Sequence, residues 1–377
     1  MRVIVAIDSL KGSLSSKEAG DAILEGIKRV DSKADVIVRP LADGGEGTVE
    51  ALVDGMNGTL QKVEVTDPLG GRVFCEYGIL QDNKTAVIEM SGAAGLTLVP
   101  KEKRNPLYTT TYGVGEVIKD AIEKGCRRFI VGIGGSATND GGVGMLQALG
   151  YGFLDKNKEQ VSFGANGLKD IVAITDDGVL PQLKECEFQI ACDVTNVLCG
   201  ENGCSAVYGP QKGATPSMIK EMDQWLLHYA TLAKKKYPKS DREQAGTGAA
   251  GGLGFAFLTF TNAVLKSGIQ IVLEETKLED SIKGADLVIT GEGRLDFQTV
   301  MGKAPIGVAK LAKKYNIPVI AFAGSVTRDA VECNENGIDA FFPILREVST
   351  LEEAMKKENA RANIMDTVEQ VFRVMKL

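Results

Sequence analysis

The segment of residues 129–149 constrains the fold more than any other, because an apolar run, a glycine-rich turn and a helical pattern follow one another within it. This order is typical of an α/β protein. At the start of such a helix, unpaired backbone N–H groups and the helix dipole favour an anion, so phosphate is the first ligand to consider. The simpler interpretation is a tight turn that lets the strand and the helix pack closely. The pattern GxxxxGK[ST] does not occur in the chain, which excludes an ordinary P-loop.

The same segment partly matches a dinucleotide-binding fingerprint. Gly132, Gly134 and Ala137 follow the apolar run, and Asp155 closes the next one. In a dinucleotide-binding fold the helix begins inside the glycine motif, whereas the helical pattern here starts only near Val143. An NAD-dependent oxidoreductase is therefore kept only as an alternative.

Two further strand, loop and helix patterns open the chain. Residues 3–7 and 36–38 are short apolar runs, and each precedes a loop and a helical pattern. In open parallel sheets, ligands bind in the loops that follow the strands. The residues of these two loops that we expect in a site are Asp8, Ser9, Lys11, Asp43, Gly44, Gly45 and Glu46.

The pattern changes near residue 59 and returns near residue 285. Residues 60–65, 72–80 and 85–90 alternate in the way that antiparallel strands do. We therefore predict an α/β fold in which residues 1–60 and 284–377 form a discontinuous, Rossmann-like domain with a parallel sheet. Residues 61–283 form a second, mixed α/β domain inserted into it.

The predicted insert contains three further features. Asp193 follows an apolar run, and Lys212 lies beside glycines, so these side chains are candidates for a base or metal ligand and for a phosphate contact. A second glycine-rich segment, which includes Gly251 and Gly252, precedes a predicted helix over residues 255–265. Glycines at this spacing let a backbone approach a ligand or another helix.

The composition excludes several classes of function. The 377 residues include 43 Lys and Arg against 50 Asp and Glu, a net charge of −7, so nucleic acid is not an expected partner. No apolar run is long enough to span a membrane or to act as a signal peptide, and we expect a cytoplasmic protein. Seven cysteines without CxxC pairs and a single histidine, His228, argue against a zinc site and against a catalytic triad. An oligomer is compatible with the sequence but is not indicated by it.

The loops together supply the groups that phosphoryl transfer needs. Cations and N–H donors neutralise the spreading charge, carboxylates hold Mg²⁺, and one carboxylate orients the attacking hydroxyl. The charged side chains in these loops are Asp8, Asp43, Glu46, Asp193, Glu292, Asp296, Lys11, Lys212, Arg294 and Lys303.

Eight segments in this order resemble the bacterial type-1 glycerate kinase family: DSLKGSLSSKEA, PLADGGEGT, EMSGAAGL, GIGGSATNDGG, CDVTN, GPQKGAT, GAAGGLG and TGEGRLDFQT. The resemblance spans almost the whole chain. It implies ATP-dependent phosphorylation of D-glycerate with Mg²⁺, by direct in-line transfer, and the 2-position as the more favoured acceptor over the 3-position. It also implies two α/β domains with the site in the cleft between them.

Chemistry and position assign the expected roles. Asp8 or Asp193 orients the glycerate hydroxyl, and Lys11 and Arg294 receive the substrate carboxylate or the transferring phosphoryl group. Mg²⁺ is expected on Asp193 together with Asp296 or Asp43. The expected substrate contacts are Ser9, Asp43, Gly44, Gly45, Glu46 and Arg294. The expected phosphate or nucleotide contacts are Gly134, Gly135, Ser136, Thr138, Asn139, Asp140, Lys212, Gly251 and Gly252. Besides the oxidoreductase, a non-catalytic sensor of a small acid is the remaining alternative.

Overall fold

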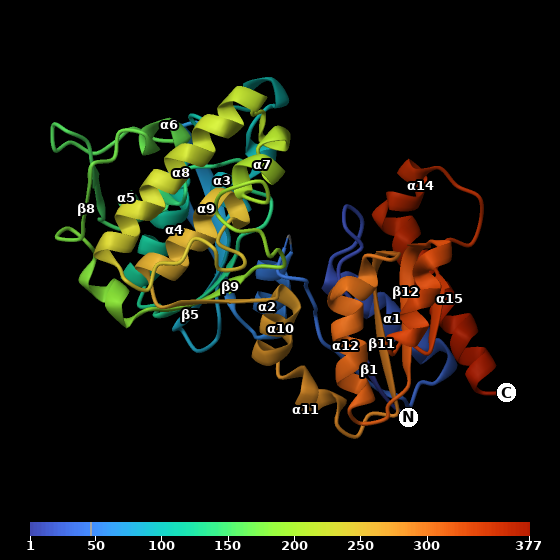
Figure 1. The fold of residues 1–377 in the computed structure, drawn as a ribbon. Coiled ribbons are helices and arrows are strands. Elements are labelled where there is room, and N and C mark those ends of the chain that lie inside the picture. The colour runs from blue at the N-terminus through green and yellow to red at the C-terminus, as the bar shows by residue number, and fades with distance from the viewer. Residues whose placement is uncertain (46) are drawn as a thin grey trace. The chain divides into compact units, whose positions relative to one another are not determined.

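The computed structural model describes residues 1–45 and 47–377. The chain forms two compact units, each with its own sheet (Figure 1). Unit 1 consists of Met1–Asn57 and Ile269–Leu377, and unit 2 of Gly58–Gly268. The first unit is therefore discontinuous in sequence.

Unit 1 contains a five-stranded sheet in which every neighbouring pair is parallel. Its strands are β1 (Arg2–Val5), β2 (Asp35–Val38), β11 (Leu287–Leu295), β12 (Val319–Val326) and β13 (Ala340–Pro343). Their spatial order is β13-β12-β11-β1-β2. The chain runs outward in one direction from β1 to β2 and in the other direction from β11 to β13, so the order reverses between β1 and β11. Such a reversal is the topological switch point of a doubly wound sheet.

Unit 1 also contains several helices. They are α1 (Ser16–Val30), α2 (Thr48–Gly55), α10 (Gly268–Glu275), α11 (Leu278–Ile282), α12 (Ala304–Lys313), α13 (Glu332–Glu335), α14 (Leu351–Met355) and α15 (Lys357–Met375). Helix α1 begins at a capping box in which Ser15 and Glu18 satisfy each other's backbone N–H groups. The apolar faces of α1 and α15 share one core with β1 and β11, and α12 lies on the other side of β11 (Figure 1).

Unit 2 contains a mixed six-stranded sheet of order β10-β9-β6-β5-β4-β3 and a two-stranded sheet. The strands are β3 (Thr59–Thr66), β4 (Arg72–Ile79), β5 (Thr85–Glu89), β6 (Arg128–Gly132), β7 (Gly152–Leu154), β8 (Ala173–Thr175), β9 (Glu187–Ala191) and β10 (Ala263–Lys266). Strands β3 to β5 are antiparallel, and β5, β6, β9 and β10 are parallel. The helices are α3 (Ser91–Ala94), α4 (Tyr112–Glu123), α5 (Val143–Ala148), α6 (Ala165–Leu168), α7 (Cys204–Tyr208), α8 (Pro216–Lys236) and α9 (Ala249–Phe260).

The predicted fold class, a parallel-sheet α/β domain interrupted by a mixed α/β domain, is confirmed. Along the chain, the boundaries between the units lie at residues 57/58 and 268/269. The sequence pattern places these boundaries near residues 60 and 284. The second difference arises because α10 packs on the unit 1 helix α12, where Ile269 lies against Gly307.

One predicted helix is wrong at its end. The pattern of residues 255–265 predicts a single helix, but α9 ends at Phe260 and Ala263–Lys266 form the edge strand β10. Thr261, with an extended backbone, ends the helix, and a short apolar run cannot distinguish strand from helix. His228 lies in α8, where its Nε2 is 2.8 Å from the carbonyl oxygen of Ile171, so its ring contacts the backbone of the same unit. No helix in the described part of the chain is long and apolar enough to cross a membrane.

Candidate functional site

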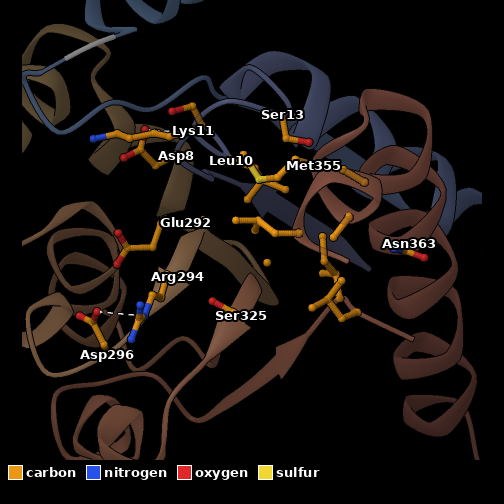
Figure 2. Close-up of a pocket in the computed structure, with 18 of the residues that line it drawn as sticks. Asp8, Leu10, Lys11, Ser13, Glu292, Arg294, Asp296, Ser325, Met355 and Asn363 are labelled. Atoms are coloured by element: carbon orange, nitrogen blue, oxygen red, sulfur yellow. Dashed lines mark hydrogen bonds and ion pairs between the residues drawn. The ribbon is translucent and has the colours of Figure 1, made fainter. Parts of the chain in front are cut away.

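The carboxyl edge of the unit 1 sheet has a cavity of about 670 Å³. It lies where β1, β11 and β12 end, which includes the switch point, where ligands bind in doubly wound sheets. Figure 2 shows charged side chains gathered on one side of this cavity and Met355 and Asn363 on the other. Its volume falls within the roughly 300–1,000 Å³ of small-molecule sites. We call the side that contains Asp8, Lys11, Glu292, Arg294 and Asp296 the charged end.

Asp8 is placed by the short loop after β1. Its backbone N–H donates to the carbonyl of Gly291 at 2.9 Å, which ties the loop to β11. Its carboxyl Oδ1 accepts the N–H of Ser9 at 2.7 Å, and the residue is only 4% exposed. Burial raises the pKa of Asp8 to about 7, and the negative charge of Asp43 acts in the same direction. A carboxyl group that titrates near neutral pH can accept and return a proton.

An ion pair joins the loops that follow β1 and β2. Lys11 Nζ lies 3.3 Å from Asp43 Oδ2, and Asp43 Oδ1 accepts the N–H of Gly45 at 3.0 Å. The Lys11 side chain is 54% exposed, so its ammonium remains accessible to an anion. Partial burial opposes charging, but Asp43 and Asp8 outweigh it and raise the pKa of Lys11. Lys11 is therefore a permanent cation at the charged end.

Strand β11 supplies a second carboxylate. Glu292 Oε1 accepts a hydrogen bond from Thr299 Oγ1 at 2.7 Å, and Oε2 lies 3.5 Å from Lys303 Nζ. Burial raises the pKa of Glu292, whereas Thr299 and Lys303 act against that shift. Lys303 also lies immediately before α12, so its charge stands at a helix N-terminus. This corner of the site can therefore hold negative charge from a ligand.

Arg294 and Asp296 complete the charged end. Arg294 Nε is 3.4 Å from Asp296 Oδ2, as the dashed line in Figure 2 marks. The Arg294 side chain is 64% exposed, whereas that of Asp296 is 15% exposed. Asp296 Oδ1 also accepts the N–H of Gln298 at 2.9 Å. The guanidinium therefore keeps donors available for a carboxylate or phosphate.

The structure brings together part of the residue set predicted from the sequence. Asp8, Ser9, Lys11, Arg294 and Asp296 line the cavity. Asp43 joins them through Lys11, and Gly44 and Gly45 follow it in the same loop. Glu46, also predicted to bind substrate, lies outside the described residues.

The predicted phosphate contacts of unit 2 lie in a different setting. Asp140 is 1% exposed and accepts the N–H and the hydroxyl of Thr111, both at 2.8 Å. It also accepts the N–H groups of Gly142 and Gly144, at 3.1 and 3.3 Å. The Asp140 carboxylate thus accepts N–H groups at the start of α5. The sequence pattern suggests that a bound anion would accept these N–H groups.

Lys212 is also buried among predicted phosphate contacts. Its Nζ donates to Ser136 Oγ at 2.8 Å and to the carbonyl of Thr138 at 2.6 Å. Burial lowers the pKa of Lys212 to about 8. Asn139 Nδ2 donates to Ser205 Oγ at 2.8 Å. These bonds join segments of unit 2 to one another.

The remaining unit 2 residues differ in exposure. Gly134 and Gly135 are exposed, whereas Gly251 and Gly252 are buried against the turn that contains Gly141. The N–H of Gly141 donates to the carbonyl of Gly251 at 2.9 Å, so this glycine segment approaches another backbone. Asp193 is exposed in the loop after β9, and its Oδ1 accepts the N–H of Gly268 at 3.1 Å. The roles predicted for all these residues stay predictions.

The geometry does not support a dinucleotide site. A dinucleotide fold places its acidic residue at the end of a strand in the same sheet as the glycine motif. Asp155 instead follows β7, which pairs with β8 in the separate two-stranded sheet. Its Oδ1 accepts the N–H groups of Asn157 and Glu159, at 2.8 and 3.0 Å, and so closes a turn.

The sequence predicts no specific role for several residues that line the cavity. Glu292 and Lys303 are in the pooled set of charged residues, and the segment TGEGRLDFQT was the available signal for Glu292. The cavity also has apolar lining residues from the β13–α14 segment and from α14, including Leu345, Leu351 and Met355. No motif marks that segment, so only the folded structure reveals it.

The chain is similar to known proteins over its full length. A model of the glycerate kinase family matches residues 3–376. A protein of Haemophilus influenzae named glycerate kinase is 51% identical over 375 residues, covering 100% of this chain and 99% of the relative. A protein of Escherichia coli K12 named glycerate 2-kinase is 49% identical, covering 94% and 93%. A solved structure named for glycerate kinase 2 of Salmonella typhimurium LT2 superposes with a TM-score of 0.93 at 47% identity, covering 100% of this chain and 98% of that one.

Proposed function

Because the chain belongs to the glycerate kinase family, we propose that it transfers the terminal phosphoryl group of ATP to a hydroxyl group of D-glycerate. The observation that supports this most directly is the charged end of the unit 1 cavity, where carboxylates and cations lie at one switch point. A substrate with a carboxylate and a donor with phosphates both need cations. A hydroxyl that attacks phosphorus also needs a proton acceptor.

In this proposal Asp8 orients the glycerate hydroxyl and accepts its proton. Its pKa of about 7 leaves a large fraction ionised at neutral pH, and its burial keeps it out of bulk water. Lys11 and Arg294 bind the carboxylate of glycerate or the phosphoryl group in transit, because both are exposed cations. The transfer is direct and in line. Asp193 is the alternative proton acceptor predicted from the sequence.

Magnesium is part of the proposal. Mg²⁺ prefers oxygen ligands and usually binds one or two carboxylates, with phosphates and water completing its shell. Asp296 and Asp193 offer such oxygens, although no cluster of three or more metal-binding side chains occurs among the residues the structure describes. The ion would neutralise charge on the phosphates of ATP. Asp296 and Asp193 are the residues we expect to hold it.

The position of phosphorylation belongs to the same proposal. One relative, from Escherichia coli K12, is named glycerate 2-kinase, which favours 2-phosphoglycerate as the product. We expect a ³¹P NMR spectrum of the reaction mixture to show a phosphomonoester coupled to the single proton at C2. Coupling to two protons would indicate the 3-phosphate instead.

A coupled assay tests the proposed activity. We expect ADP to form in proportion to D-glycerate, and not without it. Lys11→Ala should lower kcat at least 100-fold with little effect on the unfolding temperature, because it removes a cation at the reacting groups. Lys17→Ala is the matched control, since Lys17 pairs with Asp21 on the exposed face of α1 and should retain normal turnover.

The same assay distinguishes the two candidate proton acceptors. If Asp8 accepts the proton, Asp8→Asn lowers kcat at least 100-fold. Asp193→Asn then lowers it mainly at limiting Mg²⁺, and excess Mg²⁺ restores part of the loss. If Asp193→Asn abolishes turnover at every Mg²⁺ concentration while Asp8→Asn is active, the roles are reversed. A protein that only bound the acid would form no ADP at all.

A further inference from the structure

We propose that the unit 1 cavity binds the adenine base of the nucleotide at its apolar end, which rests on the proposed function. The apolar end consists of Leu10, Ile344, Leu345, Leu351 and Met355. Glycerate is a three-carbon acid without an apolar surface, so it would fill only a fraction of a cavity of about 670 Å³. The charged end suits the acid and the phosphates. The apolar end suits a larger and apolar group attached to them.

The apolar end has a buried floor and an exposed rim, an arrangement that can hold a purine base. Leu10 and Ile344 are 4% and 3% exposed and form a buried floor. Leu345, Leu351 and Met355 are 43%, 78% and 36% exposed and form a rim that nothing in the described part of the chain covers. Large apolar side chains gathered around one opening are typical of a binding site, because leaving them in water is unfavourable. A purine ring would cover them with its faces.

Met355, in α14, packs against the loop that follows β1. Gly12 has φ +79°, and a Cβ at this position would lie 2.8 Å from Met355 Cε. The loop that contains Asp8 and Lys11 therefore passes directly against the side chain of α14. One loop thus contacts both ends of the cavity, which places a base and its phosphates within one continuous space.

Polar atoms are also present where a base would need them. Ser13 lines the cavity, and its Oγ is buried without a hydrogen-bond partner among the described residues. Asn363 also lines the cavity, on the same side as Met355 (Figure 2). Small-molecule sites combine apolar walls with a few placed polar groups that fix orientation. A hydroxyl and an amide can donate to ring nitrogens and accept from the exocyclic amine of adenine.

Two variants test the assignment without changing net charge. In Leu351→Asn and Met355→Asn, we expect the Kd for ADP, measured by calorimetry, and the KM for ATP to rise at least fivefold. The KM for D-glycerate and the Kd for inorganic triphosphate should stay within twofold of wild type, because neither ligand has a base. Val348→Asn is the control, since Val348 lies in the same segment, is fully exposed and does not line the cavity.

Each other outcome overturns the proposal. Unchanged ADP binding in both variants places the base elsewhere, and equal losses for ADP and triphosphate indicate a disturbed loop. A raised KM for glycerate alone assigns the apolar end to the acid. Leu351 is mostly exposed, so Leu351→Asn decides the matter if Met355→Asn does not fold. ADP binding is measured without turnover, so wild type that binds ADP but fails to phosphorylate glycerate contradicts the proposed function and not this inference.

Discussion

The burial of Asp8 opposes the ionised form of its carboxyl group, which is the form that we propose accepts the proton of the substrate. The pKa of Asp8 lies at about 7 in the folded chain, against 3.8 for an unburied aspartate. Between these values the folded state binds more protons than the unfolded state, so the contribution of Asp8 to stability falls as the pH rises through this window. Above pH 7 the whole penalty is present, at most about 4 kcal/mol for a shift of about three pKa units.

Asp8→Asn should therefore be more stable than wild type at high pH and lose activity. We expect its unfolding free energy, from urea titrations, to exceed that of wild type by about 1–4 kcal/mol at pH 8 and by much less at pH 4.5. The control is Asp21→Asn, an exposed change on α1 that should shift neither value by more than about 0.5 kcal/mol. An advantage of the same size at both pH values would contradict a buried, titrating Asp8.

The same group predicts the pH dependence of the wild-type enzyme. If the ionised form of Asp8 accepts the proton, log kcat/KM should rise with a slope of one up to pH about 7 and level off above it. Initial rates with saturating Mg²⁺ between pH 5.5 and 9 measure this profile. A flat profile across pH 7 would assign the proton transfer to another group.

Lys212 presents the opposite case, a charged group whose contacts are internal. Its ammonium donates to Ser136 and Thr138 in the interior of unit 2. Lys212→Ala leaves these acceptors unpaired and opens a cavity, so the unfolding free energy should fall by about 2–4 kcal/mol. Chemical denaturation measures this, with exposed Lys220→Ala as the control. Wild-type stability combined with a raised KM for ATP would instead support the phosphate contact predicted from the sequence.

Among the structural elements, helix α9 depends on close backbone approach at its start. Gly251 has φ +66°, and a Cβ there would lie 2.1 Å from the carbonyl oxygen of Thr138. Gly251→Ala should therefore lower the unfolding free energy by more than about 3 kcal/mol, because conformational strain and a steric clash add. Gly200→Ala is the matched control: φ is +92° but nothing lies within 4 Å, so only the strain of about 1–2 kcal/mol remains. Equal losses in thermal unfolding would show that packing at Gly251 is unimportant.

Secondary-structure features were predictable where a few neighbouring residues determine them. The cap of α1 at Ser15, Pro216 at the start of α8 and the alternation of β3 and β4 are each written in a few neighbouring residues. The end of α9 was not, because Ala263–Lys266 becomes a strand only by pairing with β9. The site divides in the same way. Asp8, after β1, and Arg294, near the end of β11, belong to strand and loop patterns that the sequence shows, whereas no motif marks the α14 side of the cavity.

At the scale of the whole molecule, the burial of Lys212 shows why a motif alone does not reveal what a side chain contacts. The Lys212 partners Ser136 and Thr138 lie more than seventy residues away in sequence, so no local pattern shows that its ammonium donates to these buried oxygen atoms. A lysine beside glycines is equally compatible with a phosphate contact and with hydrogen bonds inside the fold. The sequence distinguishes them only once the fold specifies which segments meet.

The division into units makes a prediction about folding. All residues of the main core of unit 2 lie between Val65 and Phe260, and its six-stranded sheet needs no strand from unit 1. Residues 58–268 expressed alone should therefore unfold in one cooperative transition, measured by circular dichroism. They should form no ADP, because Asp8 and Lys11 belong to unit 1.

A core variant provides the control for this fragment. Phe129 stacks on Phe188 with ring centroids 4.7 Å apart, across β6 and β9. Phe129→Ala should lower the stability of the fragment and of the full chain by a similar amount, about 3–5 kcal/mol, if the fragment keeps its native core. A fragment that melts without a transition, or that is insensitive to this change, would show that unit 2 depends on unit 1 to fold. The insertion of one unit into the other would then be a requirement for folding and not only an order of segments along the chain.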